Sequence, residues 1–202
     1  MKQLNRLVMV NWYVLGAQEI PIKGSVAIVG PNGSGKSSLL DAMQTILMGG
    51  HKRHLSFNAS AGEKSERSLR TYCLGYLDDG GKAASAREDS ITYLAMSFFD
   101  TETAKESCVG IAISASTASA EEEILGRFIL PDFSVSLDDF TVKQGNGRMP
   151  RPWPEVRDSL MKQCPDMILE KRASRYIREL VTHLSHDAAM PNDDDKFIKN
   201  FK

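Results

Sequence analysis

The sequence predicts an α/β fold in which a strand–loop–helix unit lies beside a mostly antiparallel sheet. An apolar run at residues 25–29 is typical of a buried central strand. Residues 36–48, a few positions later, carry apolar side chains at helical spacing. Residues 90–99 and 109–114 are two strand candidates in close succession. We expect one domain over the 202 residues, with a core near 1–77, an antiparallel arm near 90–140 and a helical part near 153–184.

The N-terminal segment predicts a hairpin before the strand–loop–helix unit. Residues 7–10 are apolar and residues 17–22 alternate weakly, so we expect two paired strands. Pro21 places the second strand at a sheet edge, because proline has no backbone N–H to donate. The helix over 36–48 should bury one stripe and end at a glycine pair. That stripe consists of Leu39, Leu40, Met43, Ile46 and Leu47.

The remaining elements are short. We expect a short helix within 67–77, a turn at 78–81, strands at 124–130 and 133–137, and a loop over 144–154. Two helices should follow, one from Pro154 to about 163 and one over 171–184.

Composition excludes several classes of protein. Hydrophobic residues make up 42% of the chain and the net charge is −1, as in an ordinary globular domain. The cysteines (Cys73, Cys108, Cys164) form no C-x-x-C pair, which argues against a disulfide framework or a zinc site. We find no signal peptide and no apolar run long enough to cross a bilayer, so we expect a cytoplasmic protein with no membrane partner.

Residues 30–37 read Gly-Pro-Asn-Gly-Ser-Gly-Lys-Ser and match the phosphate-loop pattern G-x-x-x-x-G-K-[ST] in full. Glycines allow the backbone to wrap a phosphate, and the helix that follows directs its positive end at the anion. Lys36 should reach the β- and γ-phosphates, and the Ser37 hydroxyl should bind Mg²⁺. The sequence therefore predicts that ATP and Mg²⁺ are bound. The expected contact residues are Asn32, Gly33, Ser34, Gly35, Lys36, Ser37 and Ser38.

The loop and its continuation through Leu-Leu-Asp-Ala at 39–42 resemble the ABC-type ATPase superfamily, and within it the SMC branch of chromosome-organising ATPases. The Asn11-Trp12 pair near the N-terminus is similar to the start of SMC heads. Residues 56–64 (Ser-Phe-Asn-Ala-Ser-Ala-Gly-Glu-Lys) and the motifs over 67–75 resemble the MukB-like SMC subunit of Wadjet-type plasmid-defence condensins. This resemblance covers about residues 4–77.

The resemblance implies the N-terminal lobe of a split ATPase head with a flanking antiparallel sheet. In such proteins a coiled coil and hinge follow, and a separate C-terminal lobe supplies the signature motif and the catalytic glutamate. Because the 202 residues contain neither a signature motif nor long heptads, we expect a half-head that hydrolyses ATP poorly by itself. Implied partners are a second copy joined through sandwiched ATP, a kleisin, a winged-helix accessory subunit, a nuclease subunit and DNA, in a nucleoid-associated complex.

Other interpretations remain open. The chain could belong to an ABC-type repair-nuclease ATPase or a transporter motor. It could also be a self-contained P-loop NTPase or kinase, in which Asp100 at the end of an apolar run holds magnesium and Glu102 positions water. The glutamine that contacts Mg²⁺ in the ABC superfamily could correspond to Gln144 or Gln163, and neither has distinctive context.

Several basic and aromatic residues have both a functional and a structural interpretation. DNA phosphates could bind the polar side of the last helix, formed by Lys171, Arg172, Arg175 and Arg178. The loop residues His51, Lys52, Arg53 and His54 could contact DNA or a γ-phosphate. Arg148, Arg151 and Trp153 could grip nucleic acid, although a tryptophan there more often packs a loop onto the core. Asn11 and Trp12 could lie near an adenine or serve strand packing. His183 and His186 are too isolated to suggest a metal site.

Overall fold

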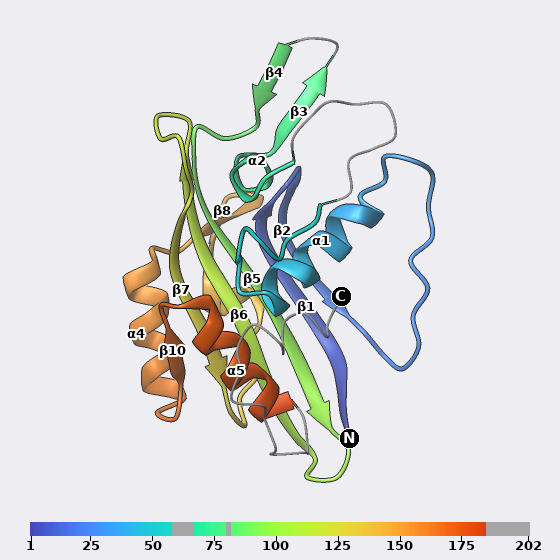
Figure 1. Cartoon of the computed structure of the whole chain (residues 1–202), viewed down its shortest axis with the longest axis vertical. Helices are drawn as coiled ribbons and strands as arrows, with labels where there is room; N and C mark the ends of the chain where they lie inside the picture. The colour runs from blue at the N-terminus through green and yellow to red at the C-terminus, as the bar shows by residue number, and fades with distance from the viewer. Residues whose placement is uncertain (58–66, 80–81, 185–202) are drawn as a thin grey trace.

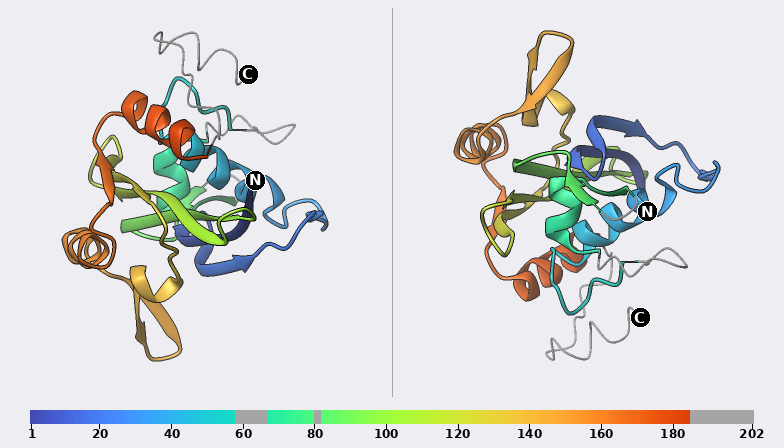
Figure 2. Two further views of the ribbon diagram at one scale, coloured as in Figure 1. Left: turned by 90° about the horizontal axis from the view of Figure 1, so that it is seen from below. Right: turned by 90° about the horizontal axis from the view of Figure 1, so that it is seen from above.

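The computed structural model describes residues 1–57, 67–79 and 82–184 and contains a six-stranded antiparallel sheet with helices on both faces (Figures 1 and 2). The strand order is β10-β7-β6-β5-β1-β2. Its strands are β1 (Lys2–Trp12), β2 (Leu15–Pro21), β5 (Asp89–Asp100), β6 (Lys105–Ser116), β7 (Glu123–Leu130) and β10 (Ile168–Glu170). Two separate hairpins are formed by β3 (Tyr76–Asp79) with β4 (Lys82–Ser85), and by β8 (Thr141–Gln144) with β9 (Gly147–Pro150).

The helices divide into two groups, one on each face of the sheet. They are α1 (Lys36–Leu47), α2 (Leu69–Leu74), α3 (Leu137–Phe140), α4 (Trp153–Gln163) and α5 (Ala173–Leu184). Along β5, Leu94 and Met96 join the core beneath α1, α2 and α5. Tyr93 and Ala95 point the other way and join the core beneath α3 and α4. This alternation follows from the two-residue period of a strand, and it is why β5 is apolar on both sides.

Much of the predicted architecture is confirmed. β1 and β2 form the N-terminal hairpin, and Pro21 lies in β2 at the edge of the sheet. All strand pairings among the described residues are antiparallel. Helix α1 buries Ile46 against the sheet and ends before two glycines with positive φ, as the sequence predicts. Leu40, which we placed in the buried stripe, is instead 55% exposed.

The prediction of a buried strand over residues 25–29 is wrong. This segment forms neither strand nor helix and makes no ladder with any described strand, and Val29 is 86% exposed. Figures 1 and 2 show it within an arc between β2 and α1 that stands away from the sheet. A strand needs a neighbouring strand to supply hydrogen-bond partners. No described strand pairs with residues 25–29, and the outer edge of β2, although open, is not used by this segment.

Two smaller predictions also fail. Residues 133–137 form no strand. Instead Ser136 caps the short helix α3 through a reciprocal bond with Asp139. The expected loop over 144–154 contains the second strand of the β8–β9 hairpin, whose turn uses the positive φ of Gly145. Of the turn expected at 78–81, residues 78 and 79 belong to β3, and positions 80–81 lie outside the described residues.

Candidate nucleotide-binding site

The glycines of the phosphate loop are required for two different reasons. Gly33 and Gly35 have φ values of +81° and +89°, a left-handed region that side-chain-bearing residues rarely adopt. Gly30 has an ordinary φ, but a Cβ there would lie 2.6 Å from the Ser34 Oγ. The loop is therefore tightly turned at its end and closely packed at its start. Both properties suit a backbone that approaches a phosphate.

Lys36 closes this loop upon itself. Its Nζ donates to the carbonyl oxygens of Gly30 at 2.7 Å and Pro31 at 2.8 Å. The Ser34 N–H also points back, toward the Pro31 carbonyl at 3.3 Å. These contacts are made by exposed groups. A phosphate that binds Lys36 would therefore replace only weak, solvent-accessible hydrogen bonds from Lys36 to the loop carbonyls.

Helix α1 begins at Lys36 and leaves its positive end available for an anion. No acidic side chain lies in its first turn, and the Gly35 N-cap supplies no side-chain acceptor. The partial positive charge of the first N–H groups is therefore not neutralised by the helix itself. Ser37 is exposed beside it, whereas Ser38 is 4% exposed. The arrangement fits a nucleotide phosphate with Mg²⁺ at the Ser37 hydroxyl, and the contact roles of residues 32–38 stay predictions.

A buried polar cluster lies beneath the second turn of α1, and sequence reasoning did not find it. Trp12 Nε1 donates to the Ser38 carbonyl at 2.7 Å, and Trp12 stacks on Tyr72 with ring centroids 4.4 Å apart. The Tyr72 hydroxyl donates to Asp41 Oδ2. Burial raises the pKa of Asp41, although the bond from Tyr72 and the charge of Arg67 act in the opposite direction. The available signal was Asp41 itself, a carboxylate among apolar positions of an amphipathic helix.

Of our two interpretations of Trp12, contact with an adenine or strand packing, the structure favours packing. Trp12 is fully buried. Asn11, which precedes it with a φ of +55°, donates from Nδ2 to the Ile91 carbonyl of β5 at 3.1 Å. Both residues fasten β1 to its surroundings.

An apolar groove of about 730 Å³ lies between the arc and the sheet. Val26 and Ile28 of the arc are 58% and 39% exposed along it. Leu39 and Met43 of α1 line another part. The rest of its lining comes from Gln3, Leu4, Leu7, Ile20, Ile22, Gly24, Ser25, Ala27 and Val29. The segment that precedes the phosphate loop thus presents apolar side chains that the described residues do not cover.

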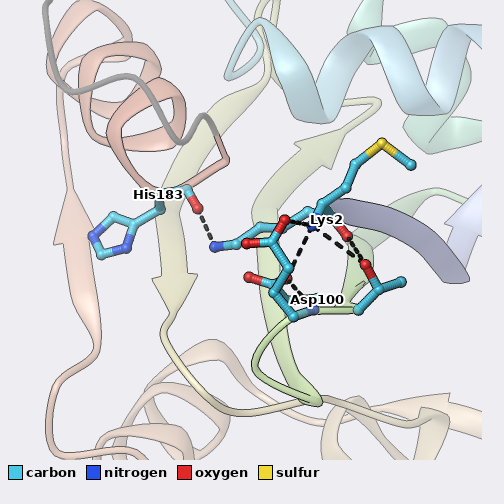
Figure 3. A network of polar contacts seen from close by, with 6 residues as sticks. Lys2, Asp100 and His183 are labelled. Atoms are coloured by element: carbon cyan, nitrogen blue, oxygen red, sulfur yellow. Dashed lines mark hydrogen bonds and ion pairs between the residues drawn. The ribbon is translucent and has the colours of Figure 1, made fainter.

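Asp100 and Glu102 are engaged elsewhere (Figure 3). The α-amino group of Met1 lies 3.3 Å from Asp100 Oδ1 and 2.9 Å from Glu102 Oε1. Hydrogen bonding to Glu102, followed by that to Asp100, raises the pKa of this amine. β5 ends at Asp100 beside the N-terminus, low in Figure 1, whereas the phosphate loop enters α1 higher up. The two carboxylates bind the N-terminal amine, at the end of the sheet away from the phosphate loop.

The glutamine candidates lie on the other side of the molecule. Gln163 belongs to α4, on the sheet face opposite α1, and its amide Nε2 lies 3.2 Å from the Ser159 Oγ. Gln144 is exposed at the end of β8 in a hairpin that projects from that same side (Figure 2). Neither reaches the phosphate loop in this arrangement.

The basic candidates have different surroundings. The four basic residues of the last segment, Lys171, Arg172, Arg175 and Arg178, are all exposed or half-buried at the surface. The Lys52 ammonium lies 3.4 Å from the carboxylates of Glu121 and Glu122, and these negative charges compensate its positive charge.

The two loop histidines form a pair, in which the rings of His51 and His54 stack at 4.5 Å. Burial lowers the pKa of His51, and the charges of His54, Arg53 and Arg127 act in the same direction. The loop therefore favours a neutral imidazole at His51.

The residues near the β8–β9 hairpin have structural partners. Arg148 pairs with Asp138, and the Arg151 guanidinium lies 3.9 Å from Glu155. Trp153 is 7% exposed and stacks near Phe128, so it packs the segment onto the core. The His183 carbonyl accepts a bond from Lys2 Nζ (Figure 3), and His186 lies outside the described residues.

Within the described part of the chain, no group of three or more His, Cys, Asp or Glu side chains is arranged to hold a metal ion. No helix there is long and apolar enough to cross a membrane. All three cysteines are buried and unpaired with one another.

Comparison with protein-family models matches residues 4–64 to the P-loop containing region of AAA domain. The matched part begins in β1 and includes β2, the arc, the phosphate loop and α1. A comparison with curated proteins gives no match. The geometry of the loop and the family match both support the same statement: residues 4–64 are similar to the P-loop region of nucleotide-binding NTPases.

Proposed function

We propose that this chain is the ATP- and Mg²⁺-binding N-terminal lobe of a composite ATPase head in a condensin-like SMC protein of the Wadjet type. ATP binds at the phosphate loop, and hydrolysis requires groups from a separate C-terminal lobe and a second head. The resemblance over residues 4–77 supports the SMC assignment. The P-loop family match supports the coarser nucleotide-binding role.

The observation that carries the proposal is the exposed apolar run before the phosphate loop. Residues 25–29 have the composition of a central strand, yet Val26, Ile28 and Val29 are 58%, 39% and 86% exposed. Full burial of such a side chain is worth about 1.5–3 kcal/mol, so leaving three exposed is costly. A second lobe that adds strands beside this run would fill the 730 Å³ groove and recover that energy.

The placement of acidic groups also supports a half-site. Asp100 and Glu102, the candidates for a self-contained NTPase, are bound to the N-terminal amine. Asp41, in the second turn of α1, is buried and accepts a hydrogen bond from Tyr72. Hydrolysis needs a group that orients the attacking water. In our proposal that group comes from the C-terminal lobe.

The proposed partners are a second copy of the head, a kleisin, a winged-helix accessory subunit, a nuclease subunit and DNA, in a cytoplasmic, nucleoid-associated complex that organises or extrudes DNA in plasmid defence. The surface basic residues of α5 and its preceding turn supply a surface for DNA phosphates. Replacing Arg172 and Arg175 by Gln should weaken DNA binding and reduce its salt dependence. The same change at Arg157 and Lys162, on α4, is the matched control.

The test of the proposal is nucleotide binding and turnover by the purified chain. We expect Mg²⁺-dependent ATP binding, its loss in Lys36→Met, and negligible turnover. Asp100→Asn should bind ATP as the parent chain does. Robust turnover that Asp100→Asn abolishes would instead establish a self-contained NTPase and refute the composite head.

A further inference from the structure

We propose that Trp12, Tyr72 and Asp41 are positioning residues that hold the P-loop helix α1 at a fixed place on the sheet. We call these three residues the α1 clamp. The inference rests on the proposed nucleotide binding, since its consequence is a phosphate loop whose Lys36 and Ser37 are already placed before a nucleotide arrives.

The first part of the clamp acts on the backbone of α1. Trp12 ends β1, is fully buried, and donates from Nε1 to the Ser38 carbonyl at 2.7 Å. Ser38 lies two residues after Lys36, in the first turn of the helix. A sheet residue therefore holds the helix directly behind the predicted phosphate contacts.

The second part acts on a side chain one turn further on. Tyr72, in α2, lies nearly parallel to the Trp12 ring, with an interplanar angle of 5°. Its hydroxyl donates to Asp41 Oδ2 and accepts from Arg67 Nη1 at 3.4 Å. Ser68 caps α2 through a reciprocal bond with Thr71, which fixes the turn that carries Tyr72.

The clamp contains a charge that packing alone does not need. Asp41 is 5% exposed, and a buried carboxylate loses much of its hydration. Replacing buried charged groups by apolar side chains of similar volume is often neutral or stabilising. The Tyr72–Asp41 hydrogen bond is directional, however, and it therefore restricts the rotation of α1 about its axis. Apolar contacts have no such direction. Asp41 lies four residues after Ser37, so both share one face of the helix.

Other restraints on the start of α1 are few. The arc that leads into it stands away from the sheet, and the Lys36 bonds stay within the loop. Leu39 and Ala42 also pack this part of α1 onto the core, but apolar packing has no direction. Among the described residues, the clamp adds directional hydrogen bonds that join the first two turns of α1 to β1 and α2. Binding groups that already hold their bound positions give a higher ligand affinity, because less conformational entropy is lost on binding.

The experiment compares Trp12→Phe and Tyr72→Phe with Tyr93→Phe as the matched control. Tyr93 is an equally buried tyrosine whose hydroxyl donates to the Arg151 carbonyl at 2.7 Å, in the core on the opposite face. All three variants keep an aromatic ring and lose the hydrogen bond that the removed group donates, and Tyr72→Phe also loses the acceptor for Arg67. Binding of Mg²⁺-ATP is measured well below each melting temperature, together with hydrogen exchange of the α1 amides without nucleotide.

We expect the two clamp variants to bind Mg²⁺-ATP about 3- to 10-fold more weakly, because the free energy of one hydrogen bond corresponds to a change of this size. Tyr93→Phe should bind Mg²⁺-ATP as the parent chain does. Exchange of the α1 amides should accelerate only in the clamp variants. Asp41→Asn, which keeps an acceptor for Tyr72, should recover most of the affinity that Asp41→Ala loses.

The outcomes separate the two proposals. If the parent chain binds ATP and all three aromatic variants bind equally, the clamp is overturned and the proposed function stands. If the parent chain does not bind ATP, the proposed function fails. Hydrogen exchange of the α1 amides then tests the clamp by itself. Equal exchange rates in Tyr72→Phe and Tyr93→Phe would overturn the clamp proposal.

Discussion

The glycine that follows α1 provides the sharpest stability prediction. Gly49 has a φ of +56°, and a Cβ there would lie 2.8 Å from Tyr176 Cδ1 and 3.1 Å from Arg127 Nε. Arg127 Nε also donates to the Gly49 carbonyl at 2.5 Å, while its Nη1 donates to the Lys171 carbonyl just before α5. An alanine at Gly49 would therefore strain the backbone and push on the contact between α1 and α5.

Gly145 is the matched control for this substitution. Its φ of +54° is nearly the same, but a Cβ added there, in the turn between β8 and β9, would meet nothing within 4 Å. The left-handed backbone costs an alanine about 1–2 kcal/mol, partly offset by about 0.4–1 kcal/mol through the less flexible unfolded chain. Gly145→Ala should therefore lose between about 0 and 1.6 kcal/mol.

Gly49→Ala carries the same backbone cost together with overpacking, which typically adds about 1–3 kcal/mol. We expect a total loss of about 2–4 kcal/mol, and a melting temperature lowered by about 2–4 °C for each kcal/mol at this chain length. Urea unfolding followed by circular dichroism measures both variants. Equal losses in the two would overturn this expectation, because they would show that Tyr176 and Arg127 move aside without cost.

Three further predictions concern single polar groups. Burial raises the pKa of Asp41 above its unfolded value, so the folded chain should lose stability as pH rises from the unfolded pKa, about 3.9, through the folded pKa. Asp41→Asn should flatten that part of the stability profile, and an unchanged slope would contradict the assignment. Tyr93→Phe should lose about 0.5–1.5 kcal/mol with its bond to the Arg151 carbonyl. Tyr176→Phe should be neutral or stabilising in urea unfolding, since the fully buried Tyr176 hydroxyl meets no protein partner among the described residues; a loss as large as that of Tyr93→Phe would argue against this.

Local patterns predicted the elements whose burial is decided by the segment itself. The helical stripe of α1 apart from Leu40, the apolar runs of β5 and β6, and the amphipathic α5 each have one clear arrangement in which most of their apolar side chains are covered. The glycine pair after α1 was equally informative, because its positive φ values suit no other residue as well.

The failures arose where the outcome depends on neighbours. Residues 25–29 have the composition of a strand, but a strand forms only beside another, and no described strand pairs with this segment. The β8–β9 hairpin was missed because its strands are short and the stretch from 144 to 154 is rich in Gly, Pro and Arg, which is typical of a loop. The α1 clamp joins residues from β1, α1 and α2, and no single-segment pattern reports contacts across 26 and 31 positions.

Calorimetry of Mg²⁺-ATP binding by the purified chain, beside Lys36→Met, decides most directly whether the phosphate loop is a nucleotide site. We expect Mg²⁺-dependent binding that the substitution abolishes, because Lys36 begins α1 within the phosphate loop. Binding that persists unchanged in Lys36→Met would contradict this assignment and place any nucleotide site elsewhere in the fold.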